Sequence, residues 1–311
     1  MASSIARLSD PAGGGAADTF HDYRRRLAPY LYIAPTIALL FLLMLYPMVA
    51  VFRYSMLDGA ILKPEPAFVW FDNFREIFSD PVFLQSIGHT LYFAIMSVIF
   101  HIIVGLSFAL MLNSERISPV TRSVLRVLYI LPWLFTAVII AVIWRLILDP
   151  NGIVNALLMA ANIVDFKVEW FSSSKTAIHA LTFVNIWAGY PLYMVTLLAG
   201  LQGIPRDLYE SASIDGASAV RQLWHVTLPQ LKPIIVSIAL LDFIWTMQVF
   251  PLVWMTTGGG PIHATEMMSI YTYKAAFSRY DFSIASASAV VLFIISMSMT
   301  YFYIRHQKAV R

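Results

Sequence analysis

The chain has 311 residues, of which 59% are hydrophobic and only 13% are charged, and its mean hydropathy is +0.71. A soluble domain carries about 25% charged residues, so this composition excludes an ordinary soluble enzyme, a disordered chain and a nucleic-acid-binding protein. The sequence has no cysteine, which excludes disulfides, iron–sulfur clusters and thiol nucleophiles. What remains is a membrane protein.

Six apolar stretches are each long enough to cross a membrane, which takes about 20 residues of helix. In chain order they are 30–52, 87–112, 125–148, 178–201, 234–255 and 284–304. We therefore expect an all-α, polytopic membrane protein with a transmembrane domain over 30–305, an N-terminal tail over 1–29 and a C-terminal tail over 306–311. The first twenty residues contain no apolar run, so no cleavable signal peptide is expected.

The positive charges predict the orientation. An even number of spans places both termini on one side, and that side receives 13 of the 21 Lys and Arg residues. Positive charge accumulates in cytoplasmic segments, so we expect both termini in the cytoplasm. The outer connections are rich in Trp, Phe, Pro and Gly, notably 63–74 and 256–265. They either dock an external partner or simply lie at the interface.

The cytoplasmic segment 202–231 is polar and has its own helix signals. Pro205 suits the first turn of a helix, and Gly216 predicts a turn because glycine accepts a positive φ. A second helix over 217–225 has apolar residues at helical spacing and is expected to end just before Pro229. This predicts a short helix–turn–helix, which is either an interfacial hairpin or a docking element for a cytoplasmic partner.

The residues of this segment favour docking. Glu-Ser-Ala, a glycine four residues further on, and a Leu-Pro pair beyond it resemble the EAA motif of binding-protein-dependent ABC importer permeases. Two positions depart from the motif, with Ser211 in place of Ala and Val226 in place of Ile, and both changes are small. The coupling residues implied by the resemblance are Glu210, Ser211, Ala212, Asp215, Gly216, Ala217, Leu228 and Pro229.

A second resemblance concerns the outer segment before the last span. Residues 257–261 (TGGGP), followed by Thr265-Glu266 and 271–277 (YTYKAAF), resemble the outer loop of the larger-type permease subunit of sugar importers of the maltose and glycerol-phosphate class. The chain looks like a compact six-span version of that subunit. The resemblance implies a type I ABC importer permease fold in the inner membrane of a bacterial cell, and alternating access driven by rigid-body coupling.

The resemblance also implies the partners. They are a second permease subunit of the smaller type, two ATPase subunits below the membrane and an external solute-binding protein. In the family, Glu210 would pair with a basic group in a cleft of the ATPase. The sequence has no G-x-x-x-x-G-K-[ST] loop to hold nucleotide phosphates. We therefore expect a transport subunit that is not itself an enzyme and has no cofactor, with ATP and Mg²⁺ bound by the partner ATPases.

An ionisable residue inside a span is costly, which makes Asp242 a candidate for the substrate pathway. Trp245, Thr246 and Val249 share its helix face at helical spacing. A carboxylate beside an indole suits a sugar, because the acid binds hydroxyl groups and the ring stacks on the C–H face. The alternative is a structural Asp242 that is bonded to a neighbouring helix.

In the fourth span, Asn185, Gly189 and Tyr193 follow each other at i, i+4 and i+8, and form the other half of the predicted pathway. The Gly-Tyr-Pro run at 189–191 is expected to break or kink this helix, which a membrane tolerates where backbone lines a cavity. Ordinary helix packing is the alternative. His89, His101 and His179 are scattered and are interpreted as packing or interface residues, so no metal site is predicted.

Two alternative hypotheses about the function remain in addition to a sugar importer. Within the same family, the alternative solutes are a polyol and a polyamine. In a different class, an ion-coupled secondary transporter would use Asp242 as its coupling acid, but it would not need the helix–turn–helix segment. The sequence does not identify the substrate or say whether the two ATPases are identical.

Overall fold

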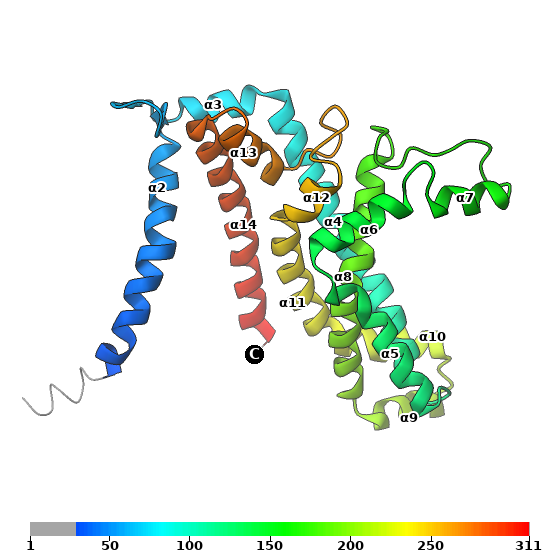
Figure 1. Cartoon of the computed structure of the whole chain (residues 1–311). Coiled ribbons are helices and arrows are strands. Elements are labelled where there is room, and N and C mark those ends of the chain that lie inside the picture. The colour runs from blue at the N-terminus through cyan, green and yellow to red at the C-terminus, as the bar shows by residue number, and fades with distance from the viewer. Residues whose placement is uncertain (1–28, 311) are drawn as a thin grey trace, which may run out of the picture. The chain divides into compact units, whose positions relative to one another are not determined.

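The computed structural model describes residues 29–310, and the side chains of 29–305 (Figure 1). The predicted tail over 1–29 lies outside the described residues apart from its last residue. The chain divides into two units, Met1–Arg53 and Tyr54–Arg311. The described part of the first unit is the helix of the first span, Pro29–Tyr54, in which a π-helical turn, η1 (Phe41–Leu45), leads into α2 (Tyr46–Tyr54).

The second unit is helical apart from a two-stranded hairpin in which Leu57 pairs with Phe68. Its elements are β1 (Leu57–Asp58), β2 (Ala67–Phe68), α3 (Asp72–Ser79), α4 (Pro81–Asn113), α5 (Pro119–Leu134), α6 (Ala137–Ile147), α7 (Ile153–Ala160), α8 (Ala177–Gln202), α9 (Arg206–Ile214), α10 (Ala219–Gln222), η2 (Leu223–Thr227), α11 (Leu228–Met247), α12 (Pro251–Thr256), α13 (Met268–Phe277) and α14 (Phe282–Val310).

Five helices of the described residues are long and apolar enough to cross a membrane, and α5 with α6 makes a sixth if the bent pair counts as one span. The all-α, multi-span expectation is confirmed. The helix α14 continues through 306–310, which the sequence had assigned to the C-terminal tail.

The third span is not the continuous helix that was predicted over 125–148. Its two halves, α5 and α6, meet at an angle of 100°. Pro132 lies in the last turn of α5, and Phe135 and Thr136 are extended. Thr136 then starts α6 as its N-cap, because its hydroxyl accepts a hydrogen bond from the backbone N–H of Ile139. A local capping signal therefore coincides with the division of a run that is mostly apolar.

The fifth span also ends earlier than the predicted 234–255. The helix α11 stops at Met247, and a new short helix, α12, starts at Pro251. The residue before a proline avoids the α region, so Phe250 cannot continue the helix into Pro251. Val249 therefore lies beyond the helix that carries Asp242, and not on its face as predicted.

Proline does not stop the helix at the two places where a π-helical turn precedes it. The pair Leu228-Pro229 was predicted to end a helix, but α10, η2 and α11 form one helix, Ala219–Met247. The backbone N–H of Leu228 bonds to the carbonyl of Leu223, five residues back, and this wider turn gives the ring of Pro229 room. The same arrangement, η1 followed by Tyr46-Pro47, occurs in the first span.

The predicted break at 189–191 is absent as well. The helix α8 runs without interruption from Ala177 to Gln202, with Pro191 buried inside it. Neighbouring helices stabilise such a proline in membrane proteins, and α8 packs against α4, α5 and α11.

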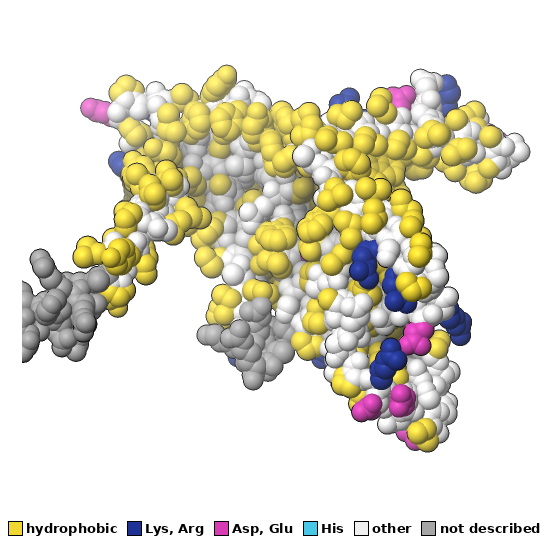
Figure 2. Space-filling view, turned by 60° about the horizontal axis from the view of Figure 1, so that its bottom comes forward, with side chains coloured by type: hydrophobic (Ala, Val, Ile, Leu, Met, Phe, Trp, Pro, Cys, Tyr) yellow, Lys and Arg dark blue, Asp and Glu magenta, His cyan; other side chains and the backbone are white. Residues whose placement is uncertain are grey.

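The core consists of three apolar clusters around these contacts. One surrounds Leu181 where α4, α6, α8 and α12 meet, one surrounds Phe83 between α3, α4, α13 and α14, and one surrounds Leu197 between α4, α8 and α11. The helices α9 and α10 lie at one end of this unit, and α3 and α13 lie at the opposite end (Figure 1). Figure 2, in which the end with α9 and α10 comes forward, shows charged side chains gathered there and hydrophobic side chains over much of the remaining surface.

Candidate functional site

A buried polar cluster joins three helices inside the apolar bundle. Asp242 on α11 faces His101 on α4, with 2.8 Å between the carboxylate Oδ2 and the imidazole Nδ1. The hydroxyl of Tyr193 on α8 donates to the same Oδ2 at 2.9 Å, and the hydroxyl of Thr246 donates to Oδ1 at 3.1 Å. All four residues are buried. The second of the two alternatives for Asp242, a bond to a neighbouring helix, is therefore present in the structure.

The partners of the imidazole determine the charge of this cluster. His101 Nε2 lies 3.0 Å from the backbone carbonyl of Asn185, which only accepts, so Nε2 carries a proton and donates it. The hydroxyls of Tyr193 and Thr246 also donate. One further proton then lies between His101 Nδ1 and the Asp242 carboxylate, as an ion pair or as a neutral pair. In either form the pair has no net charge, which allows it to be buried.

The other two predicted residues of the fourth span support this cluster from behind. Asn185 presents its carbonyl to His101, and its side-chain amide donates to the hydroxyl of Ser97 at 2.9 Å. Gly189 lies against the His101 ring, and a Cβ at that position would overlap the imidazole. Gly189 is therefore needed for close approach between α8 and α4, and not for a break in α8.

A cavity of about 230 Å³ opens beside the cluster. The structure brings five of the predicted pathway residues to its wall: Asn185, Gly189, Asp242, Thr246 and Val249. Aromatic side chains come from the bend between α5 and α6, where Trp133 and Phe135 complete the wall. Sequence reasoning had assigned no role to these two residues.

Trp245 does not share this cavity with Asp242. Its side chain is 59% exposed and lines a separate groove of about 460 Å³ together with residues such as Thr196 and Ser237. The predicted pairing of the Asp242 carboxylate with the Trp245 indole is therefore wrong. Because the real partner of Asp242 lies 141 residues away on α4, helical spacing within one span could not find it.

The segment 202–231 forms the expected pair of helices, with Gly216 in the turn at φ +75°. Two side-chain contacts hold the pair in place. Tyr209 and Thr227 join their hydroxyls at 3.0 Å, and the amide of Gln222 donates to the hydroxyl of Ser213 at 2.9 Å. The segment is therefore an ordered element with a defined shape.

One face of this element is uncovered. Ile214, Val220 and Trp224 are 87%, 66% and 64% exposed. Glu210, one helical turn before Ile214 on α9, is exposed and forms no hydrogen bond or ion pair within the described residues. Large apolar side chains exposed together around a charge indicate a protein contact. Of the other predicted coupling residues, Ser211, Asp215, Gly216 and Pro229 are exposed, and Ala212, Ala217 and Leu228 are half-buried.

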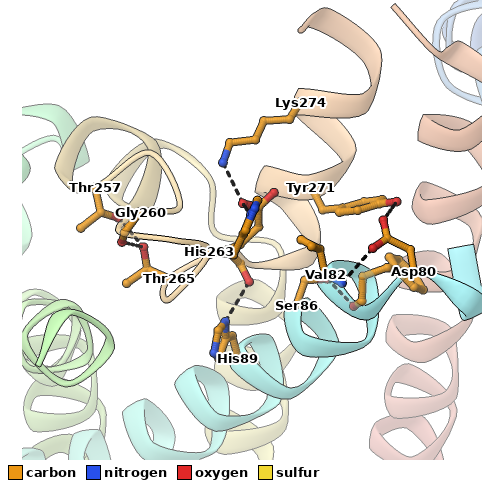
Figure 3. A network of polar contacts seen from close by, with 12 residues as sticks. Asp80, Val82, Ser86, His89, Thr257, Gly260, His263, Thr265, Tyr271 and Lys274 are labelled. Atoms are coloured by element: carbon orange, nitrogen blue, oxygen red, sulfur yellow. Dashed lines mark hydrogen bonds and ion pairs between the residues drawn. The ribbon is translucent and has the colours of Figure 1, made fainter. Parts of the chain in front are cut away.

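A second polar network lies at the opposite end of the unit (Figure 3). The carboxylate of Glu266 is buried and lies 2.6 Å from His263 Nδ1 and 2.7 Å from the ammonium group of Lys274. The backbone carbonyl of the same Glu266 lies 3.2 Å from the ring of His89 on α4. These contacts connect the loop between α12 and α13 to two helices.

The phenol of Tyr271 extends this network to the start of α4. Its hydroxyl donates to Asp80 Oδ2 at 2.8 Å, while the other carboxylate oxygen of Asp80 caps α4. Burial raises the pKa of Tyr271 to about 12; the nearby Asp80 carboxylate adds to the rise, and Arg279 above the ring opposes it. Among the described residues, no three His, Asp or Glu side chains converge as metal ligands.

Comparison with known proteins extends over most of the chain. The family model described as "Binding-protein-dependent transport system inner membrane component" matches residues 101–311. The chain is 34% identical over 284 residues to the trehalose/maltose transport system permease protein MalF of Thermococcus litoralis, covering 91% of this chain and 94% of that protein. It is also 34% identical over 287 residues to the sulfoquinovosyl glycerol transport system permease protein SmoG of Agrobacterium fabrum, covering 91% of each.

Solved structures show the same fold. A chain of a bacterial ABC transporter involved in the import of the acidic polysaccharide alginate superposes with a TM-score of 0.80 at 23% identity, covering 94% of this chain and 99% of that chain. A bacterial alginate ABC transporter solved with an alginate pentasaccharide-bound periplasmic protein superposes with a TM-score of 0.79, also at 23% identity, over 94% of this chain and 97% of that one. The family model over residues 101–311 and the two relatives at 34% identity show that the chain belongs to the family of binding-protein-dependent transport system inner membrane components.

Proposed function

We propose that the chain is one of two permease subunits of an ATP-driven importer for a sugar or a sugar derivative, and that it forms half of the translocation pathway. The relatives named for trehalose and maltose and for sulfoquinovosyl glycerol support this class of solute. The observation that carries the proposal is the cavity beside Asp242, because it combines hydroxyl and amide groups with aromatic walls and has no net charge.

The paired state of Asp242 distinguishes between the candidate solutes. A polyamine would need an acid whose charge is free, whereas the charge of Asp242 is balanced within the pair with His101. A neutral sugar or polyol needs only hydrogen-bonding groups, and Thr246 and Asn185 supply them at the cavity wall. Trp133 offers the flat apolar face on which the C–H side of a pyranose ring stacks.

The size of the cavity supports a shared site. About 230 Å³ is smaller than the roughly 300–1,000 Å³ of pockets that enclose drug-sized ligands. The cavity therefore fits about one sugar ring, and the second permease supplies the remaining contacts. Val249 and Gly189 shape the wall, Tyr193 positions Asp242, and Trp245 stands outside the site in its own groove.

The helix pair α9 and α10 is the coupling element in this proposal. Two ATPase subunits dock on the cytoplasmic side, where the exposed Glu210 pairs with a basic group and the apolar face of Ile214, Val220 and Trp224 is covered. ATP and Mg²⁺ bind to those subunits, since this sequence has no phosphate-binding loop. Both termini lie in the cytoplasm, and the solute-binding protein docks at the opposite end of the bundle.

The continuous helix Ala219–Met247 explains how the two sites communicate. It starts in the coupling element and carries Asp242 at the cavity, over about 35 Å at 1.5 Å per residue. Because η2 takes Pro229 without breaking the helix, a displacement of α10 by ATPase closure moves the cavity wall as a rigid body.

Uptake into proteoliposomes tests this function. The complete complex, with its binding protein, is supplied with ATP and either maltose, a polyol such as sorbitol, or spermidine. We expect ATP-dependent uptake of the sugar and little or no uptake of spermidine. Uptake of spermidine alone would contradict the assignment of the solute class.

A further inference from the structure

Among the described residues, the non-glycine residues with positive φ all lie at one end of the second unit. The non-glycine residues with positive φ among the described residues are Ile61, Trp70, Asn162, Ile262, His263 and Tyr280. Each lies in a connection at the end opposite α9 and α10, the end at which the proposed function places the binding protein. At the coupling end, the described residue with positive φ is the glycine Gly216.

Four of these residues also expose a large apolar or aromatic side chain: Ile61, Trp70 and Tyr280 are 59%, 65% and 62% exposed, and Ile262 is 89% exposed. A β-branched residue at φ 44° is a genuine outlier, because its Cβ crowds the backbone in the left-handed region. Strain of this kind persists where the surrounding structure enforces it, and it concentrates at functional sites.

The surroundings of Ile262 enforce its conformation. The hydroxyl of Thr265 donates to the backbone carbonyl of Gly260 at 2.7 Å and contacts the hydroxyl of Thr257 at 2.7 Å. Backbone bonds from Ala264 to Pro261 and from Thr265 to Gly259 close the loop across its tip. The tip is therefore held in shape from within.

The base of the loop is fixed to the helices below it. Next to Ile262, His263 contacts the buried carboxylate of Glu266, which also binds Lys274 on α13 (Figure 3). The carbonyl of Glu266 faces His89 on α4. The loop thus holds one exposed aliphatic side chain in a fixed direction on a polar, hydrogen-bonded support.

We propose that Ile262 is an anchor residue for the external solute-binding protein, an inference that rests on the proposed function. A fixed side chain lowers the entropic cost of binding a folded partner. A fluid lipid surface gains nothing from a fixed direction. A single apolar tip with polar neighbours also differs from the broad apolar surface of a permanent subunit interface.

Photo-crosslinking identifies what covers the tip. The photoreactive amino acid p-benzoylphenylalanine replaces Ile262 in the full chain, which is expressed in its native cells, and crosslinked products are identified by mass spectrometry. We expect an extracytoplasmic solute-binding protein as the product. The matched control places the probe at Ile163, which is 68% exposed in a different outer connection, and gives no such product. Crosslinks only to lipid or to the second permease would overturn the proposal.

Substitution separates the side chain from the backbone strain. Ile262→Asn suits the left-handed backbone and keeps the loop shape, but it removes the apolar contact. Ile262→Leu keeps the contact. The complete complex is placed in nanodiscs. Its ATPase activity is then measured as a function of the concentration of the free, sugar-loaded binding protein that the crosslinking experiment identifies.

We expect the concentration for half-maximal stimulation to rise roughly tenfold or more with Ile262→Asn, because burial of an aliphatic side chain accounts for at least this factor. Ile262→Leu and the control Ile163→Ser stay within about threefold of wild type. An unchanged Ile262→Asn complex overturns the anchor and leaves the proposed function intact. A wild-type complex that no binding protein stimulates contradicts the proposed function itself.

Discussion

Asp242 and His101 share one proton, and this makes each residue dependent on the other. Removal of either partner from a buried pair leaves an unpaired polar or charged group, which costs about 3–5 kcal/mol. Without His101, the Asp242 carboxylate retains its hydrogen bonds from Tyr193 and Thr246 but loses the imidazole. Without Asp242, the His101 imidazole retains only its hydrogen bond to the carbonyl of Asn185. The pair therefore behaves as one structural unit, and its effects on stability are not additive.

A double-mutant cycle tests this dependence. Asp242→Ala and His101→Ala each lower the thermal unfolding midpoint of the purified complex by several degrees, and the double variant loses less than the sum of the two. Intrinsic tryptophan fluorescence reports the midpoint. Asp242→Asn is the milder control, because an amide can donate to Nδ1 of a neutral imidazole. Strict additivity of the two alanine substitutions would show that the pair is not coupled.

Gly189 allows a second prediction at the same site. In Gly189→Ala the new methyl group meets the His101 ring, which has to move away from Asp242. We expect lower stability, by about 1–3 kcal/mol as for overpacking in a core, and reduced transport. Gly88→Ala on α4 is the matched control, since a Cβ there meets nothing within 4 Å and alanine favours the helix. Equal behaviour of the two variants would argue against a packing role for Gly189.

Sequence reasoning reached only part of this site. The cost of an acid in a membrane singled out Asp242, and helical spacing placed Asn185 and Gly189 on one face. His101 was interpreted as a packing residue although it carries a similar cost, because nothing in the sequence says which faces of α4, α8 and α11 meet. The aromatic walls from Trp133 and Phe135 depend on the bend after Pro132, which an apolar run does not reveal.

The helices themselves were largely predictable, and their interruptions were not. Apolar runs of sufficient length located all six spans to within a few residues at most ends. Proline was the unreliable signal: Pro191 and Pro229 lie within continuous helices, while Pro251 starts a new one. The difference lies in tertiary packing around α8 and in the π-helical turn before Pro229, neither of which is encoded in the proline alone.

The turn of the coupling element depends on a left-handed glycine. In Gly216→Val the β-branched side chain disfavours φ +75° by about 1–2 kcal/mol, although no neighbour obstructs it. We expect the angle between α9 and α10 to relax and sugar uptake per ATP hydrolysed to fall. Gly216→Asn, which tolerates the left-handed region, retains more coupling. If Gly216→Val and Gly216→Asn take up equal amounts of sugar per ATP hydrolysed, the angle between α9 and α10 is not important for coupling.

The contact between α13 and the start of α4 has a pH signature. The pKa of Tyr271 is about 12 in the folded protein against 10.0 as the ordinary value, so folding favours the protonated phenol. This contribution to stability is complete below pH 10 and disappears as the pH rises towards 12. Tyr271→Phe removes it, so the difference in unfolding midpoint between wild type and variant is expected to narrow over this window. If the difference in unfolding midpoint stays constant as the pH rises from 10 to 12, ionisation of Tyr271 does not contribute to stability.

Considered as a whole molecule, the chain has two ends that are proposed to bind partner proteins, and one helix joins the first of these ends to the cavity. The proposed coupling element has exposed apolar side chains and the carboxylate of Glu210, which has no partner within the part of the chain that the structure describes. The opposite end has rigid, strained loops, and Ala219–Met247 connects the first end to the cavity. The motif in 210–229 was sufficient to predict the family. The substrate and the completed pathway were not predictable, because in the proposed function both depend on surfaces contributed by other chains.

The most direct test of this account is co-purification followed by an ATPase assay in nanodiscs, with Glu210→Ala compared with wild type. Glu210 is exposed and unbonded within the described residues, so its loss leaves the fold intact and removes only an external contact. Asp207→Ala, an exposed acid in the first turn of the same helix, is the control.

We predict that two ATPase subunits and a second permease co-purify with the wild-type chain, and that loaded binding protein stimulates ATP hydrolysis. Glu210→Ala should lose the ATPases or the stimulation, while Asp207→Ala keeps both. The account is contradicted if the chain purifies alone and transports solute under an ion gradient without ATP, in which case Asp242 would be a coupling-ion site.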